Sequence, residues 1–161
     1  MKNKFSLNLE VTLVEMIFSI LIFVIAGVII LNCFFIARFT QLKANDKIIV
    51  GNIIQSNIET IKSFNNFSDT EEFLIENFHI LKNEQNVHTY NNFYDKNWEL
   101  SRETDYEFLL TLVVSENFTD NGTIINIKLK AEKVKPYPFI NKINNNQVIY
   151  SIETNKFYPS Y

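Results

Sequence analysis

The sequence has little cysteine, glycine, proline and histidine. Its 161 residues include one Cys, three Gly, three Pro and two His. A single cysteine excludes an intramolecular disulfide. The three scattered glycines, Gly27, Gly51 and Gly122, exclude a glycine-rich phosphate-binding loop, and His79 and His88 form no HExxH-type metal motif. We therefore expect no metal, no cofactor and no enzymatic activity.

Charge is also absent from a long N-terminal stretch. Between Glu15 and Arg38 lie 22 uncharged residues. At about 1.5 Å per residue, a helix of that length spans roughly 33 Å, close to the bilayer's hydrocarbon thickness of about 30 Å. We therefore predict one membrane-spanning helix. Because Lys2 and Lys4 precede it with no acid before Glu10, we expect a single-pass inner-membrane protein with a cytoplasmic N terminus and a periplasmic C-terminal domain.

The residues around Glu15 carry a family resemblance. The stretch VTLVEMIFSILIF (Val11–Phe23) resembles the N terminus of type IV pilin-like proteins, namely pilins, type II secretion pseudopilins and pilin-like subunits of DNA-uptake machines. In this family the mature chain begins with an apolar residue, then Thr or Ser, two apolar residues and a Glu, followed by a long apolar helix. The matching residues are Val11, Thr12, Leu13, Val14 and Glu15.

The resemblance implies specific roles for three residues. Prepilin peptidase would cut between Glu10 and Val11 and methylate the Val11 amine, although the family usually has Gly where this chain has Glu10. Glu15 would pair with the freed amine of a neighbouring subunit. A carboxylate costs roughly 2.5–3.5 kcal/mol at the bilayer centre and less at the edge, so a cationic partner would offset part of that cost. The alternative is that Glu15 only marks the membrane edge.

A second helical pattern follows the uncharged run. Apolar residues recur there every three or four positions: Phe39, Leu42, Ile49, Ile53, Ile54, Ile58, Ile61 and Phe64. We predict one continuous helix from Val11 to about Lys62, broken by the stretch 63–69. A short second helix is expected over Thr70–Leu81, followed by a polar loop over Lys82–Leu100.

The last third of the sequence favours strands. We predict strands over Tyr106–Glu116, 123–134 and 147–158, with a hairpin turn at Asn121-Gly122. In the second of these, one set of alternating residues should face the core: Ile125, Ile127, Leu129 and Ala131. The fold class is therefore α+β, with a long N-terminal helix packed on a small antiparallel sheet of three or four strands. The pilin-like resemblance implies the same architecture.

A basic and aromatic stretch near the C terminus is the remaining candidate site. Lysines interleave with aromatic residues there, which is a pattern that can contact DNA. The candidate residues are Lys128, Lys130, Lys133, Lys135 and Tyr137. The alternative is a solvated strand face, because Lys128 and Lys130 alternate with Ile127 and Leu129.

These patterns predict an organisation and a function. We expect a leader-like segment (1–10), a transmembrane half-helix (11–37), an amphipathic half-helix (38–63) and a periplasmic domain (64–161). The expected function is that of a minor pilin-like structural subunit, whose partners are other pilin-like subunits, prepilin peptidase and the inner membrane. It would serve type II secretion, DNA uptake or pilus assembly. The alternative is a permanently anchored adaptor or receptor that never enters a filament.

Overall fold

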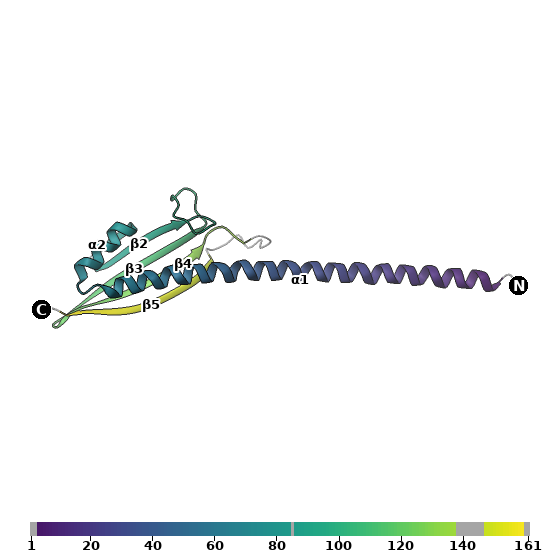
Figure 1. Cartoon of the computed structure of the whole chain (residues 1–161), viewed down its shortest axis with the longest axis horizontal. Helices are drawn as coiled ribbons and strands as arrows, with labels where there is room; N and C mark the ends of the chain where they lie inside the picture. Colours follow the sequence, from purple (N-terminus) through teal and green to yellow (C-terminus); the bar gives the residue numbers. More distant parts are fainter. Residues whose placement is uncertain (1–2, 85, 138–146, 160–161) are drawn as a thin grey trace. The chain divides into compact units, whose positions relative to one another are not determined.

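The described part of the chain folds into two helices and five strands (Figure 1). The computed structural model describes residues 3–84, 86–137 and 147–159, with side chains from Thr12 onward. The elements are α1 (Asn3–Ser63), α2 (Phe67–Asn77), β1 (His79–Glu84), β2 (Val87–Tyr94), β3 (Phe108–Thr119), β4 (Gly122–Lys133) and β5 (Gln147–Pro159). They divide into two compact units, Met1–Leu42 and Lys43–Tyr161. The predicted α+β class is confirmed.

Helix α1 is continuous through both the apolar and the amphipathic patterns of the sequence. It begins at Asn3 rather than at the expected Val11. The residues before Val11 include no Gly or Pro, so nothing in them interrupts helical backbone. Its end at Ser63 agrees with the predicted break.

The sheet is larger than expected. Its five strands run in the order β1-β2-β3-β4-β5, and every neighbouring pair is antiparallel. The three predicted strands correspond to β3, β4 and β5, with ends that differ by no more than three residues. The predicted loop over Lys82–Leu100 is wrong, because most of it forms the end of β1 and all of β2.

Helix α2 is shifted towards the N terminus relative to the prediction. It covers Phe67–Asn77 and is capped by Asn66, whose Oδ1 accepts the Asp69 N–H at 2.9 Å. Asn66 is therefore the N-cap of α2. The residues expected to end this helix instead form its C-cap at Phe78 and the start of β1.

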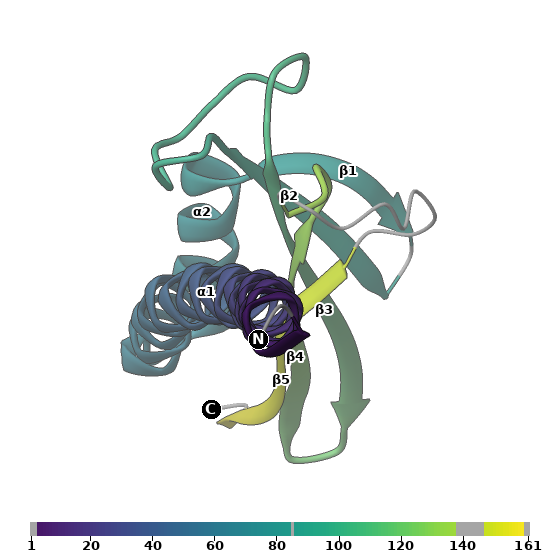
Figure 2. The ribbon, with the colours of Figure 1, turned by 90° about the vertical axis from the view of Figure 1, so that its right-hand side faces the viewer.

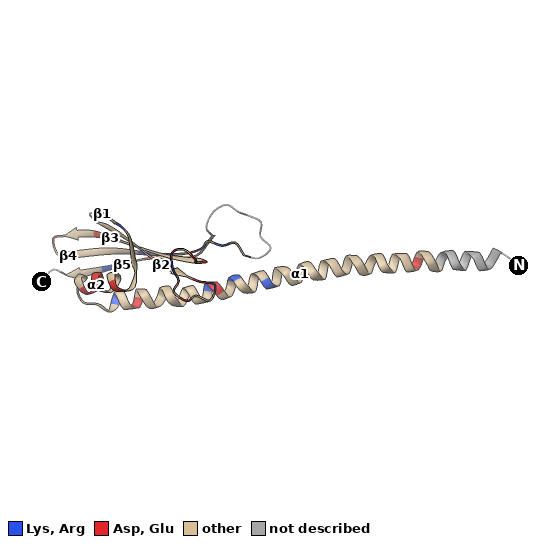
Figure 3. Cartoon of the chain, turned by 90° about the horizontal axis from the view of Figure 1, so that it is seen from above, with Lys and Arg blue, Asp and Glu red and all other residues tan. Residues whose placement is uncertain are grey.

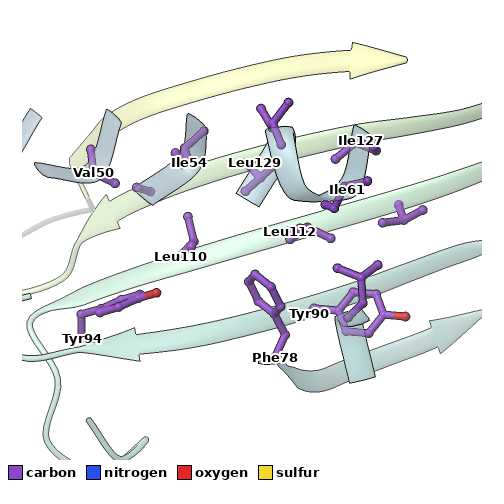
Figure 4. Packing of buried hydrophobic residues seen from close by; sticks show 14 of the residues in the cluster. Val50, Ile54, Ile61, Phe78, Tyr90, Tyr94, Leu110, Leu112, Ile127 and Leu129 are labelled. Carbon is purple, nitrogen blue, oxygen red and sulfur yellow. The ribbon is translucent and has the colours of Figure 1, made fainter. Parts of the chain in front are cut away.

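The core of the second unit lies between one face of the sheet and two helical segments. The Lys43–Ser63 part of α1 and helix α2 lie on this same face (Figure 2). Alternate residues of the strands meet them (Figure 4). The predicted inward set of β4 is confirmed, since its four side chains are fully buried. The largest apolar side chains that are fully buried are Val50, Ile54, Ile61, Leu74, Phe108, Leu110, Leu112, Val114, Ile125, Ile127 and Leu129.

The β3–β4 hairpin is closed by a two-residue turn. Thr119 pairs with Gly122, so the turn residues are Asp120 and Asn121 and the glycine already belongs to β4. The φ of Gly122 is 151°, a region that residues with a Cβ rarely adopt. A Cβ there would also collide with the Tyr158 carbonyl oxygen. The hairpin is confirmed, but its turn lies one residue before the predicted Asn121-Gly122, and the glycine allows β5 to approach it.

A lysine of β5 joins the sheet to the end of α1. Lys156 Nζ donates to the Ile61 and Lys62 carbonyl oxygens at 3.1 and 2.8 Å, and also to the Phe64 carbonyl oxygen. The last carbonyls of a helix have no partner within the helix, and the helix dipole favours a cation beside them. Burial lowers the pKa of Lys156.

Candidate functional site

The first unit exposes apolar surface along the helix. One helix of the described chain, Thr12–Ser63, is long and apolar enough to cross a membrane. The large apolar side chains from Leu13 to Ile36 leave between 43% and 79% of their surface exposed. Figure 3 shows this stretch free of charge between an acidic residue near its N-terminal end and the first basic residue. Apolar surface of this extent requires a cover of lipid or protein.

Glu15 interrupts the apolar surface close to its N-terminal end. Its side chain is exposed, and a shallow groove beside it is lined by Thr12, Met16 and Ser19 among others. Because residues three and four apart share a helix face, Thr12, Glu15 and Ser19 form one polar stripe. Ser19 Oγ donates to the Glu15 backbone oxygen at 2.8 Å, which leaves the Glu15 carboxylate out of that hydrogen bond.

The expected cleavage point lies inside helical backbone. Glu10 and Val11 both belong to α1, and their side chains lie outside the described residues. Cleavage between them and methylation of Val11 stay predictions.

The surface lysines of the basic stretch lie beside acids. Lys128 and Lys135 are each about half exposed, and Lys130 somewhat less. Ion pairs of this kind add little stability, but they reduce the positive charge of the surface. The pairs are Lys128–Glu153, Lys130–Glu132 and Lys135–Asp105, with N–O distances of 3.8, 2.9 and 3.2 Å.

The other two residues of that stretch are buried. Lys133 Nζ lies 3.2 Å from a Glu107 carboxylate oxygen and 3.9 Å from the centre of the Phe108 ring. Tyr137 is 4% exposed. These two side chains are part of the interior of the unit rather than of a surface for nucleic acid. DNA contact stays a prediction that their burial does not support.

Sequence reasoning missed a buried acid, Asp46, that accepts two side-chain hydrogen bonds. It lies on α1 and is 9% exposed. Its Oδ1 accepts the Trp98 indole N–H at 3.1 Å, and its Oδ2 accepts the Tyr137 hydroxyl at 2.8 Å. The amphipathic pattern places Asp46 one helical turn before Val50, on the buried stripe. An acidic residue at a position that the helical pattern predicts to be buried could have indicated this site.

The Asp46 site joins three segments that are far apart in sequence. Trp98 stacks on Phe108 with ring centroids 4.0 Å apart, and its backbone φ is 65°. Burial, followed by the hydrogen bond and the charge of Asp46, raises the pKa of Tyr137. Two buried donors bond to one carboxylate in this site. The site therefore holds three segments of the chain together and has a structural role.

The described residues contain no group of three or more His, Cys, Asp or Glu side chains placed to hold a metal ion. Comparisons with the known protein families, with curated proteins and with solved structures gave no match. The function is therefore argued from the residues alone.

Proposed function

We propose that this protein is a pilin-like structural subunit whose apolar half-helix is held in a membrane and bundles with other subunits. The observation that carries the proposal is the polar stripe at the start of the exposed apolar surface. A single carboxylate at that position needs a cationic partner or the headgroup region. The order of residues from Val11 to Glu15 favours the partner, a neighbouring subunit's N-terminal amine. The machine would be a secretion, DNA-uptake or pilus system.

The same features would suit a permanently anchored adaptor, and Glu15 separates the two functions. In the filament subunit, Glu15→Gln and Glu15→Ala should leave membrane abundance unchanged but lower crosslinking to other pilin-like subunits by about tenfold, as expected for loss of one ion pair. Complementation of a deletion strain should fail in parallel. Glu59→Gln is the matched control, since Glu59 is an exposed acid on the same helix whose carboxylate accepts a hydrogen bond from Gln55 Nε2.

Normal crosslinking and complementation by both Glu15 variants at normal abundance would refute the pairing role and favour the adaptor. Processing gives a separate measurement. Intact mass of the membrane-extracted protein, with and without prepilin peptidase, should show a methylated Val11 start only when the peptidase is present. An unchanged Met1 start in both samples would remove the processing claim, and Glu10→Gly should then permit cleavage.

A further inference from the structure

A cavity lies on the face of the sheet opposite the helices. Tyr90 and Tyr94 of β2 belong to the core, so the alternate residues Asn91 and Phe93 point to the other face. There they line a cavity of about 430 Å³ together with β1 and the segment Ser101–Glu103. This volume falls within the range of pockets that hold small molecules. We call it the back-face cavity.

The wall of the back-face cavity opposite the strands is fixed in place. Ser101 N–H donates to the Phe93 carbonyl oxygen at 2.9 Å, and Ser101 Oγ donates to the Asp105 carbonyl oxygen at 2.6 Å. On the strands, the Phe93 ring contacts the His79 ring and the Tyr106 ring, with centroid separations of 6.1 and 4.9 Å. One side of the cavity is therefore formed by packed aromatic rings, and the other by a segment that is hydrogen-bonded to β2.

One buried polar atom in this region has no partner. Asn91 is 6% exposed, and its Oδ1 is the one buried side-chain N or O atom in the described chain without a hydrogen bond. A buried acceptor left unpaired is unfavourable by roughly 1–3 kcal/mol. Asn92, its neighbour on the core side, donates to the Asn77 carbonyl oxygen at 2.9 Å. The Asn91 Oδ1 is thus a hydrogen-bond acceptor that the fold leaves available to a bound molecule.

The cavity also presents charges of both signs and exposed apolar groups. Arg102 and Glu103 are adjacent and exposed, and neither takes part in an ion pair within the described ranges. Arginine matches a carboxylate in charge and shape, and a glutamate matches an ammonium group. Ile80 and Leu81 add apolar walls that are 53% and 63% exposed.

We propose that the back-face cavity binds a free α-amino acid with an aliphatic or aromatic side chain. Its carboxylate would pair with Arg102 and its ammonium group with Glu103. Its N–H donors would satisfy the Asn91 amide, and its side chain would pack on Phe93 and the β1 residues. This site lies outside the helix that carries the proposed filament function, and its test is independent of that function.

The experiment titrates L-phenylalanine and L-leucine into the full-length protein in phosphatidylcholine nanodiscs, with ligand-observed NMR as the readout. We expect saturable binding. N-acetyl-L-phenylalanine and L-phenylalaninamide each lack one charge and should bind about tenfold more weakly. Arg102→Gln and Glu103→Gln should weaken L-phenylalanine binding by a similar factor. Lys96→Gln, on the same loop but outside the cavity lining, should not.

Four results would overturn the proposal. The first three are no saturable binding up to about 10 mM, unchanged binding by the Arg102 and Glu103 variants, and equal binding of the uncharged N-acetyl-L-phenylalaninamide. Equal binding of N-acetyl-L-phenylalanine would also overturn it and indicate a peptide C terminus instead. Asn91→Leu should bind more weakly yet unfold at the same temperature as the wild type or higher, because it removes an unpaired polar atom. Unchanged binding by Asn91→Leu, or a lower unfolding temperature, would overturn the binding role given to the Asn91 amide.

Discussion

Replacing Asp46 by Ala should destabilise the second unit strongly. The carboxylate is buried and accepts hydrogen bonds from two buried donors, the Trp98 indole and the Tyr137 hydroxyl. Alanine removes both acceptors and leaves both donors without a partner. The surrounding structure closes the site to solvent, so water cannot readily replace the lost oxygens.

The magnitude follows from the two contacts. A hydrogen bond to a charged group contributes about 1.5–3 kcal/mol, and the donor distances of 3.1 and 2.8 Å are those of well-formed bonds. Allowing for partial relaxation, the expected loss is about 3–5 kcal/mol. That is a large part of the 5–15 kcal/mol typical of a folded domain. Asp46→Asn keeps one acceptor oxygen and should lose about 1–2 kcal/mol.

The sequence supplies its own reporter for this measurement. Trp98 is the only tryptophan of the chain, and it contacts Asp46 directly. Urea unfolding of the full-length protein in detergent, followed by tryptophan fluorescence, therefore measures the stability of the unit and the environment of the site together. Glu59→Ala is the control, because this exposed acid lies on the same helix and should change stability by no more than about 0.5 kcal/mol.

A loss below about 1 kcal/mol for Asp46→Ala would refute the reasoning, provided that Glu59→Ala is also near wild type. It would mean that the two donors find other partners or that the junction contributes no net stability. The double variant with Tyr137→Phe distinguishes these outcomes. If Asp46 and Tyr137 are coupled through their hydrogen bond, the two losses should not be additive.

Three further predictions concern other contacts of the second unit. Burial and Asp46 raise the pKa of Tyr137, so the folded state keeps a proton that the unfolded state loses above about pH 10. The free energy of unfolding should therefore fall as pH rises past that value, and it should fall less steeply in Tyr137→Phe. Gly122→Ala should lower the unfolding free energy by about 2 kcal/mol or more, whereas Gly51→Ala, with open space at its Cβ inside a helix, should raise it by roughly 0.5–1 kcal/mol. Lys156→Met should lose about 1.5–3 kcal/mol, because it removes the donor to the last carbonyls of α1, while Lys128→Met should be nearly neutral. Urea unfolding checks the last two, and equal effects of a substitution and its control would contradict them.

The regular parts of the fold were predictable because burial repeats with the period of the element. The apolar residues after Arg38 recur as a helix requires, and the β4 residues from Ile125 to Ala131 alternate as a half-buried strand requires. Both patterns depend only on local sequence. They identify a core-facing side without knowledge of what covers it.

The β1–β2 hairpin was not predictable by the same method. Its strand β2 has buried polar residues on both faces, Asn91 and Asn92, so its alternation is hidden. Asn92 is tolerated because it donates to the end of α2, a contact that depends on the tertiary fold. Hydropathy cannot show which buried amide has a partner. For this reason the sequence patterns predicted neither strand β2 nor the back-face cavity.

The lysine stretch shows the same limit for a candidate site. Lys133 and Lys135 are two residues apart in one basic sequence, yet one is buried against Phe108 and the other is about half exposed. The spacing of the lysines indicates positive charge, but it does not show that Glu107 and Asp105, from the segment before β3, lie beside them. Likewise, Tyr137 counts in the sequence as an aromatic residue beside lysines, and in the structure its hydroxyl donates to Asp46 on α1.

Glu15 and Asp46 of α1 lead to opposite expectations because the two parts of the helix have different surroundings. Glu15 lies on a part whose apolar side chains are exposed all round, so its removal should not affect folding of the sheet. Asp46 lies on a part with one buried stripe, so its removal should destabilise the sheet without affecting insertion of the apolar segment. A Glu15 variant that folds normally but fails to assemble would therefore differ clearly from an Asp46 variant that inserts but unfolds. If both variants failed in the same way, loss of function could not be assigned to subunit pairing.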